Sequence, residues 1–260
     1  LRLTVCHLLF ARWPLLVVCV APRASRLVPY YLLLTTCNLF PTTCFCTHFL
    51  IDFDSILIPK TAILIGATGL TGSCLLNNLL EDNDFTKIII FSRKTTGIKH
   101  PKIEEHIIDL FKIKNYKHLI QGDVAFCCIG TTRSKTPDKE IYTKIDCGIP
   151  SDLAIICNEN KVDCFLVISS MGAKANSNTF YLKTKGMMER LVLNSGIKNI
   201  YVLRPSIIIG NRNEKRFTER FVKILFKCFD FFMVGIFEPY KSIHAKDIAK
   251  AMIILSKVDF

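Results

Sequence analysis

A tyrosine and a lysine four positions apart, Tyr181 and Lys185, follow a short apolar segment that ends in two serines. On a helix this spacing places both side chains on one face, one turn apart. The ammonium group of a lysine stabilises a neighbouring phenolate, and a serine hydroxyl can polarise a substrate oxygen. The arrangement predicts proton transfer between Tyr181 and an oxygen atom of a substrate.

A glycine-rich loop at residues 66–72, with the sequence GATGLTG, lies between a short apolar segment and an amphipathic one. A strand, a glycine loop and a helix in this order are typical of a dinucleotide-binding site. Gly66 permits the tight turn, Gly69 allows the backbone to approach a pyrophosphate, and Gly72 allows the helix to pack against the strand. The helix N-terminus attracts the charge of the phosphates.

A basic pair, Arg93 and Lys94, follows the second predicted strand, and Arg93 lies 21 residues beyond Gly72. A dinucleotide-binding fold places the residue that reads the adenosine ribose at about this distance. A carboxylate there would accept a hydrogen bond from the ribose 2′-hydroxyl, whereas a guanidinium suits a 2′-phosphate. The sequence therefore favours NADP(H) over NAD(H).

The elements that must position these residues alternate along the chain, which predicts an α/β fold with a doubly wound parallel sheet of the Rossmann type. The helices are expected in the amphipathic stretch after residue 70 and at residues 141–160, 181–194 and 247–257. The strands are expected at residues 61–65, 87–91, 105–110, 123–129, 163–169 and 199–203.

The composition divides the chain in two, because all 12 glycines lie at or after Gly66. We predict one NAD(P)-binding domain at residues 61–260 and an N-terminal extension at residues 1–60. The extension carries arginines without an acid before Asp52, and residues 27–51 are uncharged. It is interpreted as a membrane anchor, a targeting segment or a stretch outside the natural folded protein.

The net charge of +12 raises the question of nucleic-acid binding. The basic residues are spread over the domain, so we expect a basic surface that suits an anionic cofactor and no nucleic-acid partner.

Cys127 and Cys128 lie in an apolar segment and are expected to pack as small hydrophobic residues in a reducing compartment. Cys44, Cys46 and His48 are too closely spaced for a convincing zinc site, and no metal is expected.

Four motifs together resemble the short-chain dehydrogenase/reductase superfamily, and more closely its atypical Tat-interacting-protein oxidoreductase-like branch. They are the loop at residues 66–72, CCIGTT at residues 127–132, SSMGA at residues 169–173 and FYLKTKG at residues 180–186. The likeness covers residues 61–260 and none of residues 1–60. It implies an NADPH-binding Rossmann domain with a small C-terminal lobe on the substrate side.

The resemblance also implies roles for individual residues. Tyr181 would be the proton donor or acceptor and would also contact the cofactor, and Lys185 would hold the nicotinamide ribose. Ser170 would be the third catalytic residue, with Ser169 as the alternative. The implied cofactor contacts are the pyrophosphate at Gly66, Thr68, Gly69, Leu70, Thr71 and Gly72, the 2′-phosphate at Arg93 and Lys94, and the adenosine and its ribose at Ile129 and Gly130.

Three functions agree with this pattern. The first is an NADPH-dependent oxidoreductase that reduces a carbonyl compound, and the second is a catalytically weak NADPH-binding regulator of a protein partner. A sugar-nucleotide epimerase is a third and weaker possibility, because the substrate lobe is small.

Residues 212–227 are basic with a Phe-rich helical face, which is expected to pack on the core or to dock a partner or a membrane surface.

The partners and the location are expectations of the same kind. The substrate is expected to be a small carbonyl compound, and a homodimer is left open. Contact with a membrane depends on whether residues 1–60 belong to the mature protein. The expected location is the cytoplasm, with the mitochondrion as the alternative.

Overall fold

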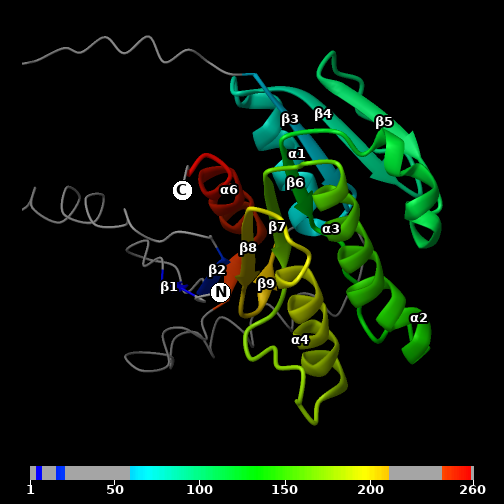
Figure 1. Ribbon diagram of the computed structural model, residues 1–260, viewed down its shortest axis with the longest axis vertical. Helices are drawn as coiled ribbons and strands as arrows, with labels where there is room; N and C mark the ends of the chain where they lie inside the picture. Colours follow the sequence, from blue (N-terminus) through cyan, green and yellow to red (C-terminus); the bar gives the residue numbers. More distant parts are fainter. Residues whose placement is uncertain (1–3, 8–15, 21–58, 211–241, 259–260) are drawn as a thin grey trace, which may run out of the picture.

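The computed structural model describes residues 4–7, 16–20, 59–210 and 242–258 (Figure 1). One sheet of eight strands forms its centre, in the order β1-β2-β8-β7-β6-β3-β4-β5. The six strands from β8 to β5 run parallel to one another. Their order reverses at β3, which lies between β4 and β6, so a ligand is expected at the carboxyl ends of these strands. The predicted doubly wound parallel sheet is confirmed.

The strands are β1 (Thr4–His7), β2 (Leu16–Val20), β3 (Lys60–Ile65), β4 (Phe85–Ser92), β5 (Ile103–Ile107), β6 (Val124–Cys127), β7 (Cys164–Ile168) and β8 (Asn199–Arg204). The short strands β9 (Ile208–Ile209) and β10 (Ile243–His244) pair with each other. The helices are α1 (Leu70–Glu81), the 3₁₀ segment η1 (Leu110–Leu119), α2 (Lys139–Thr143), the π-helical turn η2 (Lys144–Gly148), α3 (Ile149–Glu159), α4 (Phe180–Leu193) and α6 (Ala245–Leu255).

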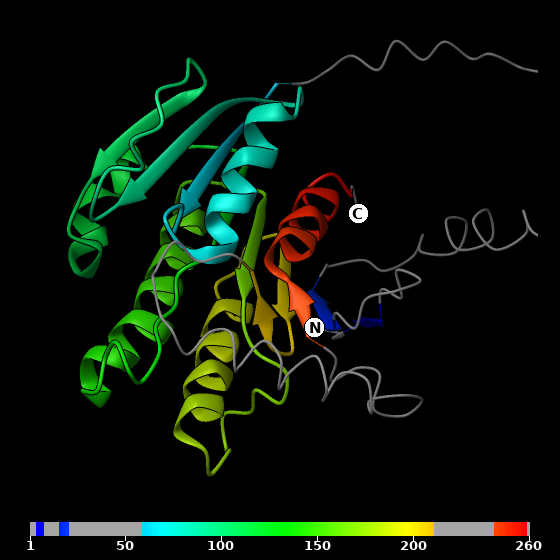
Figure 2. The same ribbon diagram turned by 180° about the vertical axis from the view of Figure 1, so that it is seen from behind.

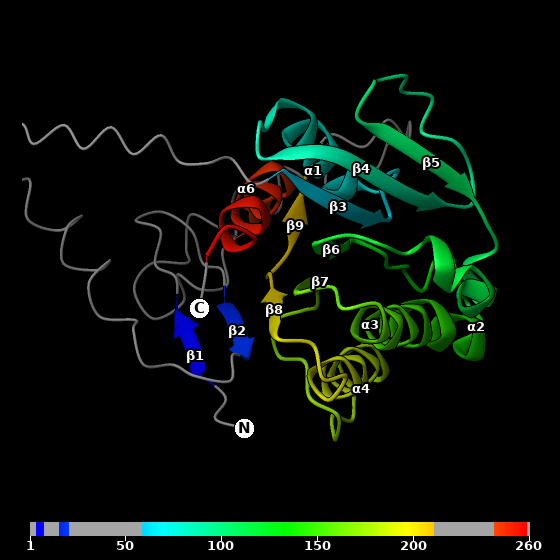
Figure 3. The ribbon, with the colours of Figure 1, turned by 45° about the horizontal axis from the view of Figure 1, so that its top comes forward.

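Helices cover both faces of the parallel sheet, as Figures 2 and 3 show. Successive side chains of a strand point to opposite faces. In β3, Ala62 and Leu64 therefore pack with α1 and α6, whereas Ile63 and Ile65 pack with η1, α3 and α4. The apolar character of the central strands follows from this burial on both sides.

The helix predicted at residues 141–160 is divided into α2, η2 and α3. Pro150 has no N–H group, so the carbonyl of Asp146 lacks its α-helical donor. The chain instead forms a wider turn in which the N–H of Ile149 donates to the carbonyl of Lys144. This turn contains Asp146, a fully buried carboxylate.

The strand predicted at residues 105–110 was placed too far along the chain, since β5 covers Ile103–Ile107. The carboxylate of Asp109 accepts a hydrogen bond from the N–H of Phe111 at 3.0 Å, which caps η1 and ends the extended segment.

Two strands from the first sixty residues join the sheet, because β2 pairs antiparallel with β8 and β1 pairs antiparallel with β2. No helix among the described residues is long and apolar enough to cross a membrane. The predicted lobe helix at residues 212–227 and the Cys44, Cys46 and His48 group lie outside the described residues.

Candidate functional site

The glycine loop between β3 and α1 leaves no space for a side chain at Gly66 or Gly72. Gly66 has a φ of +88°, a conformation that glycine adopts without strain. A Cβ atom at Gly66 would lie 2.7 Å from the carbonyl carbon of Cys128. A Cβ atom at Gly72 would overlap the carbonyl oxygen of Gly66 and lie 2.7 Å from its carbon. The loop therefore packs directly against the end of β6 and against the first turn of α1.

The first turn of α1 is suited to a bound anion. Gly69 occupies the N-cap position, and no side chain caps the helix. The N–H groups of a helix's first turn have no partner within the helix and carry a partial positive charge. Thr68 is exposed beside them, whereas Thr71 is buried. A close-packed glycine cradle at an uncapped helix N-terminus fits the pyrophosphate of a dinucleotide.

Arg93 and Lys94 are exposed at the carboxyl end of β4. The buried hydroxyl of Ser92 donates to the carbonyl oxygen of Lys94 at 2.7 Å and fixes the turn. Strand β4 pairs with β3 in parallel, with Phe91 opposite Ile65, so the basic pair lies at the same edge of the sheet as the glycine loop. Ile129 and Gly130 follow β6 at this edge.

Tyr181 and Lys185 lie one turn apart on α4 but differ strongly in burial. The side chain of Tyr181 is 39% exposed and lines a cavity of about 350 Å³. Lys185 is only 4% exposed, and its ammonium group donates to the carbonyl oxygen of Ile168 at 3.3 Å. The side chain of Lys185 therefore links α4, which carries Tyr181, to the end of β7 through a hydrogen bond.

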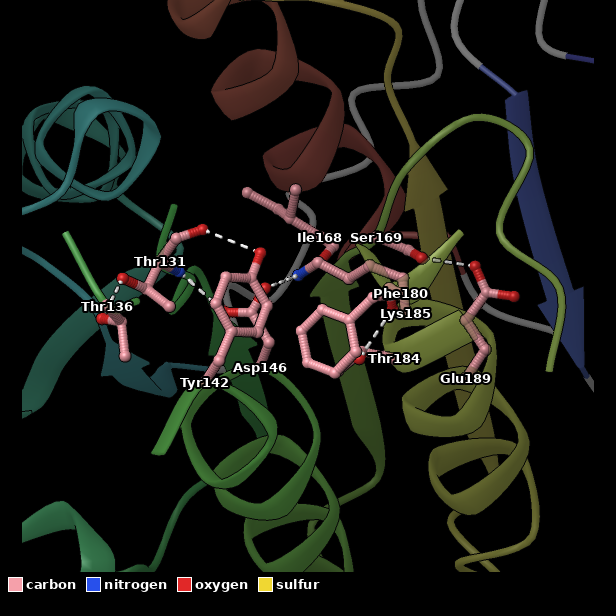
Figure 4. A network of polar contacts seen from close by, with 10 residues as sticks. All are labelled: Thr131, Thr136, Tyr142, Asp146, Ile168, Ser169, Phe180, Thr184, Lys185 and Glu189. Carbon is pink, nitrogen blue, oxygen red and sulfur yellow. Dashed lines mark hydrogen bonds and ion pairs between the residues drawn. The ribbon is translucent and has the colours of Figure 1, made fainter. Parts of the chain in front are cut away.

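Asp146 is a buried carboxylate of the candidate site that the sequence interpretation missed. One carboxylate oxygen accepts a hydrogen bond from the N–H of Thr131 at 2.7 Å, and the other lies 3.5 Å from the ammonium group of Lys185 (Figure 4). The second oxygen accepts no hydrogen bond from the described residues. The signal in the sequence was an acidic residue placed directly between the apolar residues Ile145 and Cys147.

Tyr142 completes this network as a hydrogen-bond donor. Its buried hydroxyl donates to the carbonyl oxygen of Thr131 at 3.2 Å, as Figure 4 shows. Burial raises the pKa of Tyr142 far above the usual value, and the charge of Asp146 raises it further. The phenol of Tyr142 therefore stays protonated and serves as a donor.

The two serines after β7 have different surroundings. The buried hydroxyl of Ser169 donates to Glu189, whose carboxylate also binds Arg204 through two guanidinium nitrogens, one of them at 2.8 Å. Ser170 is half-buried, and its hydroxyl contacts the neighbouring carbonyl oxygen of Met171 at 3.3 Å. The hydroxyl of Ser169 is thus engaged with the ion pair of Glu189 and Arg204, and the role of Ser170 in catalysis stays a prediction.

A larger cavity of about 430 Å³ lies beside a different part of α4, and Tyr181 does not line it. Glu189 and Arg204 are among its lining residues, and both are used in their mutual ion pair. The one carboxylate among its described lining residues is therefore committed to an ion pair, and the smaller cavity, which Tyr181 lines, is the better candidate for chemistry.

The cysteines of the site have no nucleophilic character. Burial raises the pKa of Cys127 to about 12 and raises that of Cys128 well above the usual value. The thiols stay protonated and pack as small apolar groups, in agreement with the expectation from their apolar context.

Replacing Asp146 by asparagine is expected to lower the free energy of unfolding by about 3 kcal/mol, because breaking a buried ion pair leaves one charge unpaired. The amide can still accept the hydrogen bond from Thr131, so the variant removes mainly the charge. Denaturant titration measures the change. Asp152→Asn is the matched control, since the pair of Asp152 with Lys114 is partly exposed and is expected to contribute less than about 1 kcal/mol. Equal losses in the two variants would contradict the assignment.

Comparison with known families identifies the domain. Residues 66–223 match the family model described as NAD(P)H-binding. This match includes the glycine loop, the basic pair, and Tyr181 with Lys185.

Two curated relatives are similar to this chain over part of their length. The chain is 30% identical over 161 residues to the protein HTATIP2 of Rattus norvegicus, and this alignment covers 60% of this chain and 66% of the relative. It is 33% identical over 156 residues to the mitochondrial protein FMP52 of Meyerozyma guilliermondii, and this alignment covers 58% of this chain and 66% of the relative. The matches thus span about two thirds of these relatives.

Solved structures share the fold at low sequence identity. The Bordetella bronchiseptica enzyme WbmH in complex with NAD⁺ has a TM-score of 0.59 at 19% identity, covering 76% of this chain and 72% of that one. The Helicobacter pylori ADP-L-glycero-D-manno-heptose-6-epimerase has a TM-score of 0.59 at 17% identity, covering 79% and 76%. The chain belongs to the NAD(P)H-binding family, within the atypical branch of the short-chain dehydrogenases/reductases that includes HTATIP2 and FMP52.

Proposed function

We propose that the protein is an NADPH-dependent oxidoreductase that reduces a carbonyl compound to an alcohol. The observation that carries this proposal is the pairing of Tyr181, which opens into a cavity, with the buried Lys185 one turn away. Both residues follow the end of β7, at the sheet edge that also carries the glycine loop. When bound, NADPH supplies the hydride that the carbonyl carbon receives.

The residues that would hold the cofactor surround this edge. The loop at residues 66–72 would bind the pyrophosphate, and Arg93 and Lys94 would bind the 2′-phosphate through charge-assisted hydrogen bonds. Ile129 and Gly130 would lie beside the adenosine and its ribose, and Lys185 would hold the nicotinamide ribose.

The chain's own residues would then control the proton. Tyr181 would donate its hydroxyl proton to the carbonyl oxygen of the substrate, while Ser170 would orient that oxygen. The ammonium group of Lys185 would stabilise the resulting phenolate. Asp146 would act on Lys185 as a positioning residue, because its carboxylate lies 3.5 Å from the ammonium group.

Replacing Arg93 by aspartate is expected to abolish the preference for NADPH. A charge-assisted hydrogen bond contributes about 1.5–3 kcal/mol, and exposure of Arg93 reduces this value. We therefore expect the wild type to bind NADPH roughly ten- to a hundredfold more tightly than NADH. The preference is also expected to shrink as salt concentration rises. Calorimetric titration of both cofactors at low and moderate salt measures it.

Lys99→Asp is the control for this experiment, because Lys99 is also exposed and lies on the same loop, and the charge change is identical. It is expected to change NADPH affinity much less than Arg93→Asp does. Equal affinities of the wild type for NADH and NADPH would refute the assignment of Arg93.

A second candidate is a catalytically weak NADPH-binding protein whose ligand state controls a protein partner. The engagement of Ser169 with Glu189 supports it, because one of the two candidate hydroxyls is directed away from substrate chemistry. This candidate predicts tight NADPH binding without turnover, and capture of a partner only when NADPH is present. Steady-state assays with and without substrate distinguish the two functions.

The location is part of the proposal. We expect the cytoplasm, with the mitochondrion as the alternative, and the word mitochondrial in the names of the FMP52 relatives supports the alternative. Fractionation of cells that express the full chain tests both compartments.

A further inference from the structure

The cavity beside Tyr181 is enclosed by aromatic rings, hydroxyl groups and one cation. The described residues that line it are Thr131, Thr132, Arg133, Tyr142, Thr179, Phe180 and Tyr181. No lining residue among those described carries a carboxylate. The walls can therefore contact a flat apolar group, and the only formal charge among the described lining residues is positive.

Arg133 is an uncommitted cation in this lining. Its side chain is exposed, and its guanidinium forms no ion pair or hydrogen bond with any residue of the described ranges. Of the acids that follow in the sequence, Asp138 accepts hydrogen bonds from the backbone of α2, the exposed Glu140 does not line the cavity, and Asp146 is buried against Lys185. A guanidinium without a partner presents a planar set of donors that matches a carboxylate or a phosphate.

A second positive charge lies at the cavity's aromatic wall. The ammonium group of Lys139 lies 5.7 Å from the centre of the Phe180 ring. Phe180 in turn meets the ring of Tyr142 edge to face, with 5.4 Å between the ring centres and an angle of 66°. These contacts hold the two rings in place, so a planar substrate group would meet a preformed wall.

The cavity volume of about 350 Å³ limits the size of the ligand. It falls at the lower end of the range of about 300–1,000 Å³ found for small-molecule sites. A compound with one ring and a short charged substituent suits this space better than a sugar nucleotide does.

We propose that the substrate is an aromatic aldehyde or ketone that carries a negatively charged group, bound by Arg133 while its carbonyl oxygen meets Tyr181. This inference rests on the proposed function. The carbonyl carbon receives a hydride from NADPH, which is oxidised to NADP⁺, and the oxygen receives the proton of Tyr181 to give an alcohol. The anionic group does not react and only positions the substrate.

The test compares two aldehydes that differ mainly in charge, para-formylbenzoate and its neutral methyl ester. The wild type is expected to have a roughly tenfold higher kcat/KM for the anion than for the ester, because its KM for the anion is lower. A factor of ten corresponds to about 1.4 kcal/mol of binding free energy. Arg133→Gln is expected to raise KM for the anion to that of the ester and to leave kcat within about twofold, because uniform binding is lost. Arg133→Lys is expected to retain part of the preference.

Arg190→Gln is the matched control, because Arg190 lies on α4 at the larger cavity and the charge change is the same. It should keep the preference for the anion. Equal kcat/KM values of the wild type for the two aldehydes, or equal effects of Arg133→Gln and Arg190→Gln, would overturn the inference. A fall in NADPH affinity in Arg133→Gln as large as the rise in KM would also overturn it, because Arg133 would then be a cofactor ligand.

A binding measurement separates this inference from the proposed function. Terephthalate, a planar dicarboxylate without a reducible carbonyl group, is titrated into the NADP⁺ complex of each variant. If neither aldehyde is reduced but terephthalate binds the wild type and not Arg133→Gln, the reductase function fails and the anion site stands. If both aldehydes are reduced alike and terephthalate does not bind, the reductase function stands and the anion site fails.

Discussion

Replacing Tyr181 by phenylalanine is expected to lower carbonyl reduction by a factor of ~10²–10⁴, the usual contribution of a general acid. The substitution removes only the hydroxyl group that would give its proton to the substrate oxygen. NADPH affinity is expected to stay within about twofold, because most of the proposed cofactor contacts lie on the glycine loop, Arg93 and Lys185. Single-turnover kinetics and a cofactor titration on the same preparation measure both quantities.

Tyr116→Phe serves as the control, because it makes the same chemical change on η1, where the ring packs against the core. This variant is expected to keep both the rate and the cofactor affinity of the wild type. If Tyr181→Phe retained more than half of the wild-type turnover, Tyr181 would have no role in the proton transfer.

Gly72→Ala is expected to have the second large effect. Alanine normally stabilises a helix relative to glycine by about 1 kcal/mol. Here the new methyl group would overlap the backbone of Gly66, so the loop and α1 must separate. We expect the free energy of unfolding to fall by about 1–3 kcal/mol, as for other overpacked sites, and NADPH binding to weaken by more than about tenfold.

Gly148→Ala is the matched control for this substitution. Gly148 has helical backbone angles, and outside its own helical turn the nearest described atom to a Cβ there, the carbonyl oxygen of Thr143, lies 4.0 Å away. The alanine is therefore expected to leave the protein as stable as the wild type or to stabilise it slightly. A Gly72→Ala protein with wild-type stability and wild-type NADPH affinity would show that the loop does not form the cradle.

The fold was predictable because local patterns and burial agree along most of the chain. Apolar segments such as residues 61–65 and 163–169 are buried on both faces of a parallel sheet, so they are recognisable without the structure. The break in the helix predicted at residues 141–160 depends on the missing N–H of Pro150, which periodicity does not detect. The end of β5 depends on the cap formed by Asp109.

The site was predictable where spacing alone brings residues together, as for Tyr181 and Lys185 on one helix. Asp146 and Lys185 lie on different helices and are 39 residues apart in the sequence, so no local pattern predicts their contact. The same holds for Ser169, whose hydroxyl is bound by Glu189 on α4 rather than by a neighbour in sequence. Long-range pairing of buried charges therefore had to come from the structure.

The central claim, hydride transfer from NADPH to a carbonyl compound, is tested most directly by following the hydride. The full chain is incubated with a metabolite extract and NADPH deuterated at the transferable position of its nicotinamide ring, and the products are examined by mass spectrometry. We predict an alcohol that carries one deuterium on the former carbonyl carbon, formed by the wild type and not by Tyr181→Phe. NADPH that binds tightly yet transfers deuterium to no product would contradict the claim and favour the regulatory function.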